Sequence, residues 1–184
     1  FFFVCGGCTY FAKKNLDEVV QQAEEKKNAE IKKDAEATYA IAMKQSAMLN
    51  ELTANITSVT LAKIKYDKSE SEVEYVTIVL KLTTKNPNKK FSHRAWSSER
   101  VILEEPRFSI LDDVGNKYSI YQVTSFRRPV GFKSYFDITS EQPSEETIYI
   151  DKPVPGAKEL KMALWEKAGD PKFYFVIPRK LWEK

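Results

Sequence analysis

The chain has 184 residues, of which 42% are hydrophobic and 30% are charged, and its formal net charge is only +3. This length suits one globular domain with an extension, and the hydrophobic share is sufficient for a core. Because lysine and glutamate are interspersed and no long basic run occurs, the clustered basic face of a nucleic-acid-binding protein is not predicted.

The amino terminus reads FFFVCGGCTY and holds both cysteines of the chain, Cys5 and Cys8. An apolar run that ends in small residues and a cysteine resembles a bacterial lipobox, in which the cysteine is lipidated. Lipidation of Cys8 would anchor the chain firmly, since acyl chains add roughly 0.8 kcal/mol per buried CH₂ group. We therefore expect residues 1–12 to be a signal remnant and membrane anchor. A disulfide between Cys5 and Cys8, or an ordinary buried apolar segment, remains the alternative.

Residues 13–54 contain neither glycine nor proline and are rich in alanine, lysine, glutamate and glutamine. Asn15, followed three residues later by Glu18, matches a capping box. The strong helix formers after it predict one helix from residue 16 to about residue 52. Because its apolar stripe is thin, we expect a charged stalk or packing helix. Self-association through a coiled coil and a frayed linker stay open as alternatives.

From residue 55 onward the pattern changes to the alternation that is typical of β-strands, most clearly at residues 73–84. Turn signals such as Asn86-Pro87-Asn88 separate the strands. The other expected strands are at residues 59–66, 99–103, 107–111, 117–123, 132–139, 147–150, 159–165 and 172–177. Roughly seven to nine short strands predict an antiparallel immunoglobulin-like β-sandwich. We expect this sandwich to occupy residues 55–184 and to fold without the helix.

Three segments carry a resemblance to a known family: YVTIVLKLTTKNPN at residues 75–88, FSILDDVGNKY at residues 108–118, and VPGAKELKMALWEKAGDPKFYFVIP at residues 154–178. Together they resemble the small immunoglobulin-like domain of bacterial lipoproteins of unknown function that is named after telomeric-repeat-binding factor. The resemblance covers residues 57–178. It implies an extracytoplasmic setting and supplies no catalytic residues.

No constellation of catalytic residues stands out in the sequence. His93 is the only histidine, so a Ser-His-Asp arrangement would have to use it. It lies beside a turn, without a nucleophile elbow, and we expect a solvent-exposed loop residue. Asp112, Asp113 and Asn116 could suggest calcium, but a hairpin around Gly115 explains them without a metal. We predict no catalytic site, no metal and no cofactor, and therefore a protein that is not an enzyme.

Candidate binding residues combine arginine and aromatic side chains, which are enriched at interface hot spots. Arg127, Arg128 and Phe132 lie together in an expected loop, and Trp165 alternates with inward-facing residues of its strand. Solvated arginines and aromatics that close the ends of the sandwich are the alternative, which we prefer for Trp96.

These patterns together predict a non-catalytic, lipid-anchored protein of the bacterial cell envelope, in the outer membrane if the source is Gram-negative. It would act as a structural or assembly module that binds other envelope proteins and touches the membrane through its lipid. The alternative is a ligand-binding or inhibitor module, which would bind a glycan or a protease through sandwich loops and exposed aromatics.

Overall fold

The computed structural model describes residues 39–98, 107–124, 127–166 and 172–183. Tyr39–Lys184 forms one compact unit. Cys8, the expected anchor, the expected helix up to residue 38 and the expected strand at residues 99–103 lie outside the described residues. The described part is mainly β and its strand pairs are antiparallel, with one exception described below, so the prediction of a mainly β fold is confirmed.

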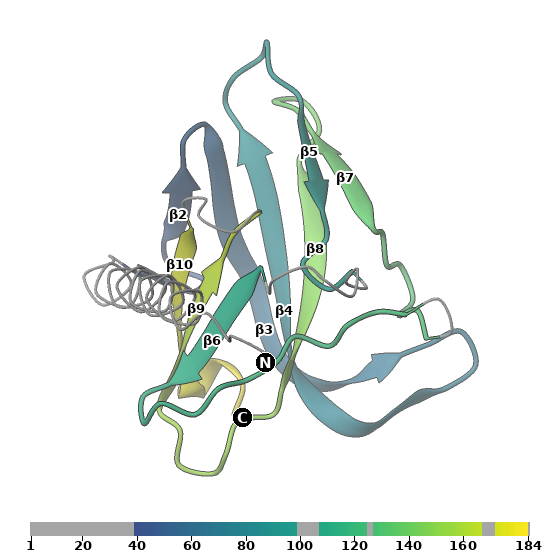
Figure 1. Ribbon diagram of the computed structural model, residues 1–184, viewed down its shortest axis with the longest axis vertical. Helices are drawn as coiled ribbons and strands as arrows, with labels where there is room; N and C mark the ends of the chain where they lie inside the picture. The colour runs from purple at the N-terminus through teal and green to yellow at the C-terminus, as the bar shows by residue number, and fades with distance from the viewer. Residues whose placement is uncertain (1–38, 99–106, 125–126, 167–171, 184) are drawn as a thin grey trace, which may run out of the picture. The chain divides into compact units, whose positions relative to one another are not determined.

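The first four-stranded sheet is built around a long hairpin of β3 (Leu52–Lys65) and β4 (Glu70–Thr84). Its edge strands are β2 (Ser46–Leu49) beside β3 and β8 (Ser144–Asp151) beside β4, and every pairing is antiparallel (Figure 1). In β4 every second residue from Val76 to Thr84 is buried, as the sequence predicts.

The second four-stranded sheet has the strand order β1-β10-β9-β6. Its strands are β1 (Ala40–Ile41), β10 (Phe173–Pro178), β9 (Glu159–Leu164) and β6 (Phe108–Asp112). The short strand β1 pairs with β10 in parallel, whereas the other pairs are antiparallel. The second sheet is therefore mixed, which differs from the fully antiparallel prediction.

A third, two-stranded sheet is formed by β5 (Phe91–Arg94) and β7 (Tyr135–Ile138). A single 3₁₀ turn, η1 (Arg179–Leu181), follows β10. The strand β5 was not predicted, because its sequence, FSHR, shows too short an alternation to signal a strand. In the part of the chain that the structure describes, no helix combines the length and the apolarity needed to cross a membrane.

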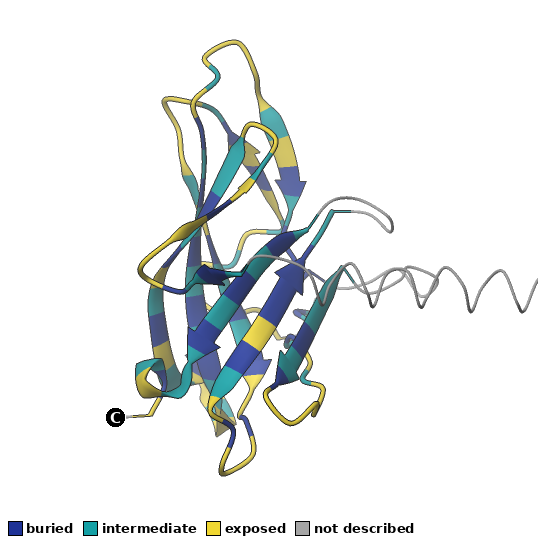
Figure 2. Ribbon diagram, turned by 90° about the vertical axis from the view of Figure 1, so that its left-hand side faces the viewer, coloured by how far each residue is buried: buried dark blue, intermediate teal, exposed yellow. Residues whose placement is uncertain are grey.

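One hydrophobic core joins the buried faces of these sheets, and the burial colours of Figure 2 alternate along the strands accordingly. Its large, fully buried side chains come from both four-stranded sheets and from the third sheet. They include Ile78, Leu80, Ile110, Ile138, Ile148, Leu160, Met162 and Phe175. Trp96 is also buried, in line with the structural role that we prefer for it.

The prediction that the helix continues to residue 52 is wrong, because residues 40–52 form β1, β2 and the start of β3. Met43 and Asn50 have positive φ angles of 61° and 54°, which an α-helix excludes. Ala42 and Ala47 are buried against the core. The helix propensity of alanine, methionine and lysine is only a weak preference, and here the burial of small side chains between the sheets overrides it.

The strand expected at residues 117–123 is also absent as a continuous element. Lys117, Ile120 and Val123 each form only an isolated bridge, to three different segments. Because successive residues pair with different neighbours, the chain crosses between strands here rather than extending one ladder.

Candidate functional site

His93 is the first feature that departs from the sequence analysis, because it is buried in β5 with only 3% of its side chain exposed. The prediction of a solvent-exposed loop histidine is wrong. Its Nε2 lies 2.8 Å from Oε2 of Glu146 in β8, and its Nδ1 contacts Oε1 of Glu166, just after β9. With a carboxylate at each ring nitrogen, the imidazole is set to donate two hydrogen bonds, which only the protonated form can do.

The remaining polar atoms of this cluster are also bonded. The second carboxylate oxygen of Glu146 accepts hydrogen bonds from the backbone N–H and the hydroxyl of Ser97, at 3.3 and 3.2 Å. A guanidinium nitrogen of Arg107 lies 3.6 Å from Glu166, and the same group donates to the carbonyl oxygens of Arg94 and Ala95. The cluster therefore places two cations against two carboxylates.

The charge state of His93 follows from these contacts. Burial alone would lower the pKa of the imidazole, but hydrogen bonds and charge from Glu146 and Glu166 raise it to about 9. A histidine that is protonated at neutral pH cannot act as a general base. The Ser97 hydroxyl bonds Glu146 rather than the imidazole, so these residues do not form a nucleophile–base pair. The geometry instead suits a polar clamp that ties β5 to β8 and to the end of β9.

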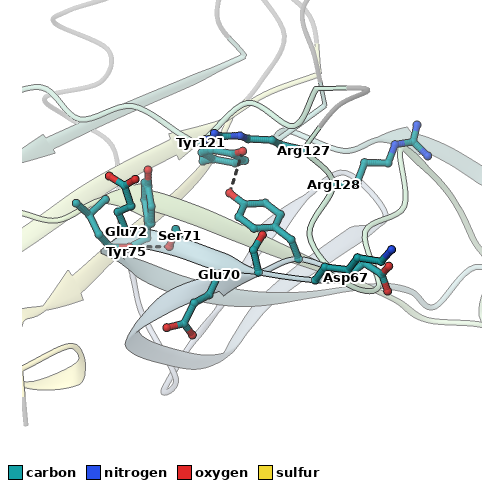
Figure 3. Close-up of a pocket in the computed structure, with 12 residues that line it drawn as sticks. Asp67, Glu70, Ser71, Glu72, Tyr75, Tyr121, Arg127 and Arg128 are labelled. Atoms are coloured by element: carbon teal, nitrogen blue, oxygen red, sulfur yellow. Dashed lines mark hydrogen bonds between the residues drawn. The ribbon is translucent and has the colours of Figure 1, made fainter.

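The second feature is an open groove of about 960 Å³ beside the tip of the β3–β4 hairpin (Figure 3). Three tyrosines, two arginines and three carboxylates dominate its lining. The lining residues are Tyr66, Asp67, Lys68, Ser69, Glu70, Ser71, Glu72, Val73, Tyr75, Tyr121, Arg127 and Arg128. We call this the tyrosine–arginine groove.

Backbone hydrogen bonds fix the walls of the groove. The hairpin tip is closed by the Tyr66 N–H, which donates to the carbonyl of Ser69 at 2.8 Å. Tyr121 is attached to β8 through its N–H, which donates to the carbonyl of Tyr149 at 2.8 Å. The arginine loop is held against the end of β3 by a 2.9 Å bond from the Val130 N–H to the carbonyl of Lys65.

The tyrosine side chains contact one another across the groove. The Tyr66 hydroxyl donates to the Tyr121 hydroxyl at 3.0 Å, and the rings of Tyr75 and Tyr121 meet edge to face at 5.7 Å. Burial raises the pKa of both Tyr66 and Tyr75. The hydrogen bond to Tyr121 raises the pKa of Tyr66 further, and the negative charge of Asp151 does the same for Tyr75. The nearby Arg127 charge acts in the opposite direction on both. These hydroxyls are therefore neutral donors at physiological pH.

The structure brings some of the sequence-derived binding residues together and separates others. Arg127 and Arg128 both line the groove and are exposed. Phe132 is half-buried and lines a smaller depression with Arg128, outside the groove. Trp165 belongs to a different surface, where Lys172 Nζ lies 4.7 Å from the centre of its ring. Its carbonyl accepts a hydrogen bond from Trp96 Nε1 at 3.0 Å.

The three tyrosines of the groove were not predicted from the sequence. Tyr66 directly follows β3, Tyr75 belongs to β4 and Tyr121 lies in the crossing segment after β6. Only the pairing of distant segments therefore brings them together. A signal was present in the β4 alternation, which places Tyr75 on the face opposite to the buried Val76.

The chemistry available at this groove is recognition through hydrogen bonds, charge and aromatic surface. Within the described residues, no group of three or more histidine, cysteine, aspartate or glutamate side chains is arranged to hold a metal ion. No protein-family model, no curated protein and no solved structure matches this chain.

Proposed function

We propose that this chain is a non-catalytic binding module that docks a protein partner in the tyrosine–arginine groove. The observation that carries the proposal is the convergence of Tyr66, Tyr75, Tyr121, Arg127 and Arg128 around one groove of about 960 Å³. Tyrosine and arginine are among the residues enriched at the hot spots of protein interfaces. Tyrosine also offers a large contact area with little loss of side-chain entropy on binding.

The setting that we propose is the bacterial cell envelope, with a lipid on Cys8 as the anchor and other envelope proteins as partners. The lipobox-like sequence before Cys8 and the resemblance to lipoprotein immunoglobulin-like domains support this setting. The two four-stranded sheets around one core are consistent with the immunoglobulin-like sandwich of that resemblance.

A glycan ligand is the second candidate for the same groove. It is favoured by the mixture of tyrosine rings with carboxylates such as Asp67 and Glu72. An aromatic ring can pack against the apolar C–H face of a sugar, and a carboxylate can accept hydrogen bonds from its hydroxyl groups. A protein partner accounts better for the two arginines at the rim, because arginine is selectively enriched at protein interfaces.

Site-specific photo-crosslinking of the full chain in native membranes tests the proposal. A photoreactive phenylalanine analogue replaces Glu72, an exposed residue of the groove, and in a matched control it replaces Lys85, an exposed residue just after β4 and outside the groove. We expect a discrete protein adduct from position 72 only, which disappears when Tyr75 and Tyr121 are changed to alanine.

Equal adducts from both positions, or no protein adduct from position 72, would contradict a protein-binding groove. Binding to immobilised glycans that depends on Tyr75 and Tyr121, without a protein adduct, would support the second candidate instead.

A further inference from the structure

We propose that the tyrosine–arginine groove recognises an acidic peptide segment and binds one of its carboxylates through Arg127, with a tyrosine hydroxyl as a second donor. This inference rests on the protein-binding function proposed above, and it adds the chemistry of the ligand.

The rim of the groove carries positive charge that is not neutralised by a neighbouring carboxylate in the described part of the chain. Arg127 and Arg128 are exposed, and among the described residues neither forms an ion pair or a hydrogen bond. Two other exposed cations near the groove are already paired, Lys63 with Glu70 at 3.2 Å and Lys152 with Glu74 at 3.1 Å. Lys68 of the lining, like the two arginines, forms no ion pair among the described residues. A guanidinium presents its N–H groups in a planar fork that matches a carboxylate, so an unpaired arginine at a groove is suited to bind one.

Tyrosine hydroxyl groups near Arg127 offer further hydrogen-bond donors. The Tyr66 hydroxyl donates to Tyr121, which leaves the hydrogen of the Tyr121 hydroxyl free among the described residues. The Tyr75 hydroxyl likewise has no hydrogen-bond partner there. In Figure 3 the side chain of Arg127 extends along Tyr121, and its charge is near enough to act on the pKa of both Tyr66 and Tyr75. A carboxylate bound here would accept from the guanidinium and from a phenol together.

The charge balance of the lining selects the kind of anion. Asp67, Glu70 and Glu72 carry three negative charges, and Lys68, Arg127 and Arg128 carry three positive charges, so the lining itself is neutral in total. Lys63, which pairs with Glu70 from outside the lining, adds one positive charge beside the groove. A polyanion such as a nucleic acid or a polyphosphate gains little from a groove with so small a net charge, and its many phosphates are repelled by the carboxylates. A peptide with an isolated glutamate or aspartate can place its carboxylate at the arginines and its uncharged parts against the tyrosine rings.

Peptide display on the full chain tests this chemistry. Random twelve-residue peptides displayed on phage are selected for binding to the wild-type protein and are counter-selected against Arg127→Gln/Arg128→Gln. We expect the recovered peptides to be enriched in aspartate and glutamate. The best of them is then synthesised with its acidic residue and with the corresponding amide, and the affinities are measured by calorimetry.

The wild-type protein should bind the acidic peptide at least about tenfold more tightly than the amide, which is the scale of one charge-assisted hydrogen bond. Arg127→Gln should cause a similar loss, and the two changes together should not add, as expected for groups in direct contact. Lys85→Gln/Lys117→Gln removes the same charge from exposed positions outside the groove and should leave the affinity within twofold.

Recovered peptides without acidic enrichment, equal affinity for acid and amide, or no recovered peptide would each overturn the inference. The proposed function would still stand if position 72 gave its protein adduct, and it would fall separately if that adduct were missing.

Discussion

The wild-type protein should lose stability between pH 6 and pH 9, and replacement of His93 by glutamine should remove this pH dependence. In the folded protein the imidazole lies between Glu146 and Glu166, and its pKa is raised from 6.5 to about 9. Because the folded pKa lies above the unfolded one, the protonated ring stabilises the fold. This contribution is complete below pH 6.5 and disappears as the pH rises through 9.

The magnitude follows from the two pKa values. At about 1.4 kcal/mol for each pH unit between them, the free energy of unfolding of the wild type should fall by about 3 kcal/mol from pH 6 to pH 9. In His93→Gln the free energy of unfolding should not show this fall between pH 6 and pH 9. At pH 7 the variant should be less stable by roughly 3–5 kcal/mol, since it leaves the carboxylate of Glu146 buried without its cationic partner.

Urea or guanidinium unfolding of both proteins, followed by fluorescence at half-unit steps of pH, measures the effect. Lysines and tyrosines that titrate near the upper limit are common to both proteins, so the difference between the two curves isolates His93. Parallel curves for wild type and variant would refute the reasoning, because the imidazole would then have the same pKa in the folded and the unfolded state.

Three further perturbations test other parts of the structure. Asp112→Asn should weaken the turn after β6. Burial opposes ionisation of Asp112, but hydrogen bonds from Asn116 and Tyr118 lower its pKa to about 2. The ionised carboxylate therefore stabilises the wild type, and acid-unfolding curves should show this contribution disappearing between pH 4 and pH 2 in the wild type but not in the variant. Ile78→Ala should cost about 2–5 kcal/mol in denaturant unfolding, whereas Met48→Ala, with 71% of the residue exposed in β2, should change stability by less than about 0.5 kcal/mol; a large effect at Met48 would contradict the placement of β2. A truncated protein that starts at Tyr39 should unfold cooperatively in calorimetry, whereas one that starts at Thr53 loses β1 and β2 and should unfold at a clearly lower temperature; equal transitions would show that these strands add nothing to the core.

The long strands could be predicted from the sequence because their signal is local. In β4 the buried residues Val76, Ile78, Leu80 and Leu82 recur at every second position, and one sheet face is enough to produce this pattern. The strands β1 and β2 could not be predicted, because Ala40, Ala47, Met48 and Leu49 are good helix formers. These segments adopt the extended conformation only because Ala40 pairs with Phe175 and Ala47 pairs with Ala54 in the folded protein.

The buried cluster and the groove depend on contacts between distant parts of the chain. Glu146 and Glu166 follow His93 by 53 and 73 residues, so no local pattern indicates that His93 is buried and charged. In the groove, Arg127 and Arg128 could be predicted as a pair of cations in a loop because they are adjacent in the sequence. The clustering of the three tyrosines could not be predicted, since the Tyr66–Tyr121 hydrogen bond joins residues 55 positions apart.

The claim that the tyrosine–arginine groove is the binding surface can be tested most directly by mapping where a bound partner lies. The ¹⁵N-labelled full chain is titrated with the acidic peptide recovered by display, or with the protein captured at position 72, and the amide chemical shifts are followed. We expect the largest changes in chemical shift at the amides of Tyr66, Tyr75, Tyr121 and Arg127. Changes centred instead on Trp165 and Lys172, with the groove amides unaffected, would contradict it.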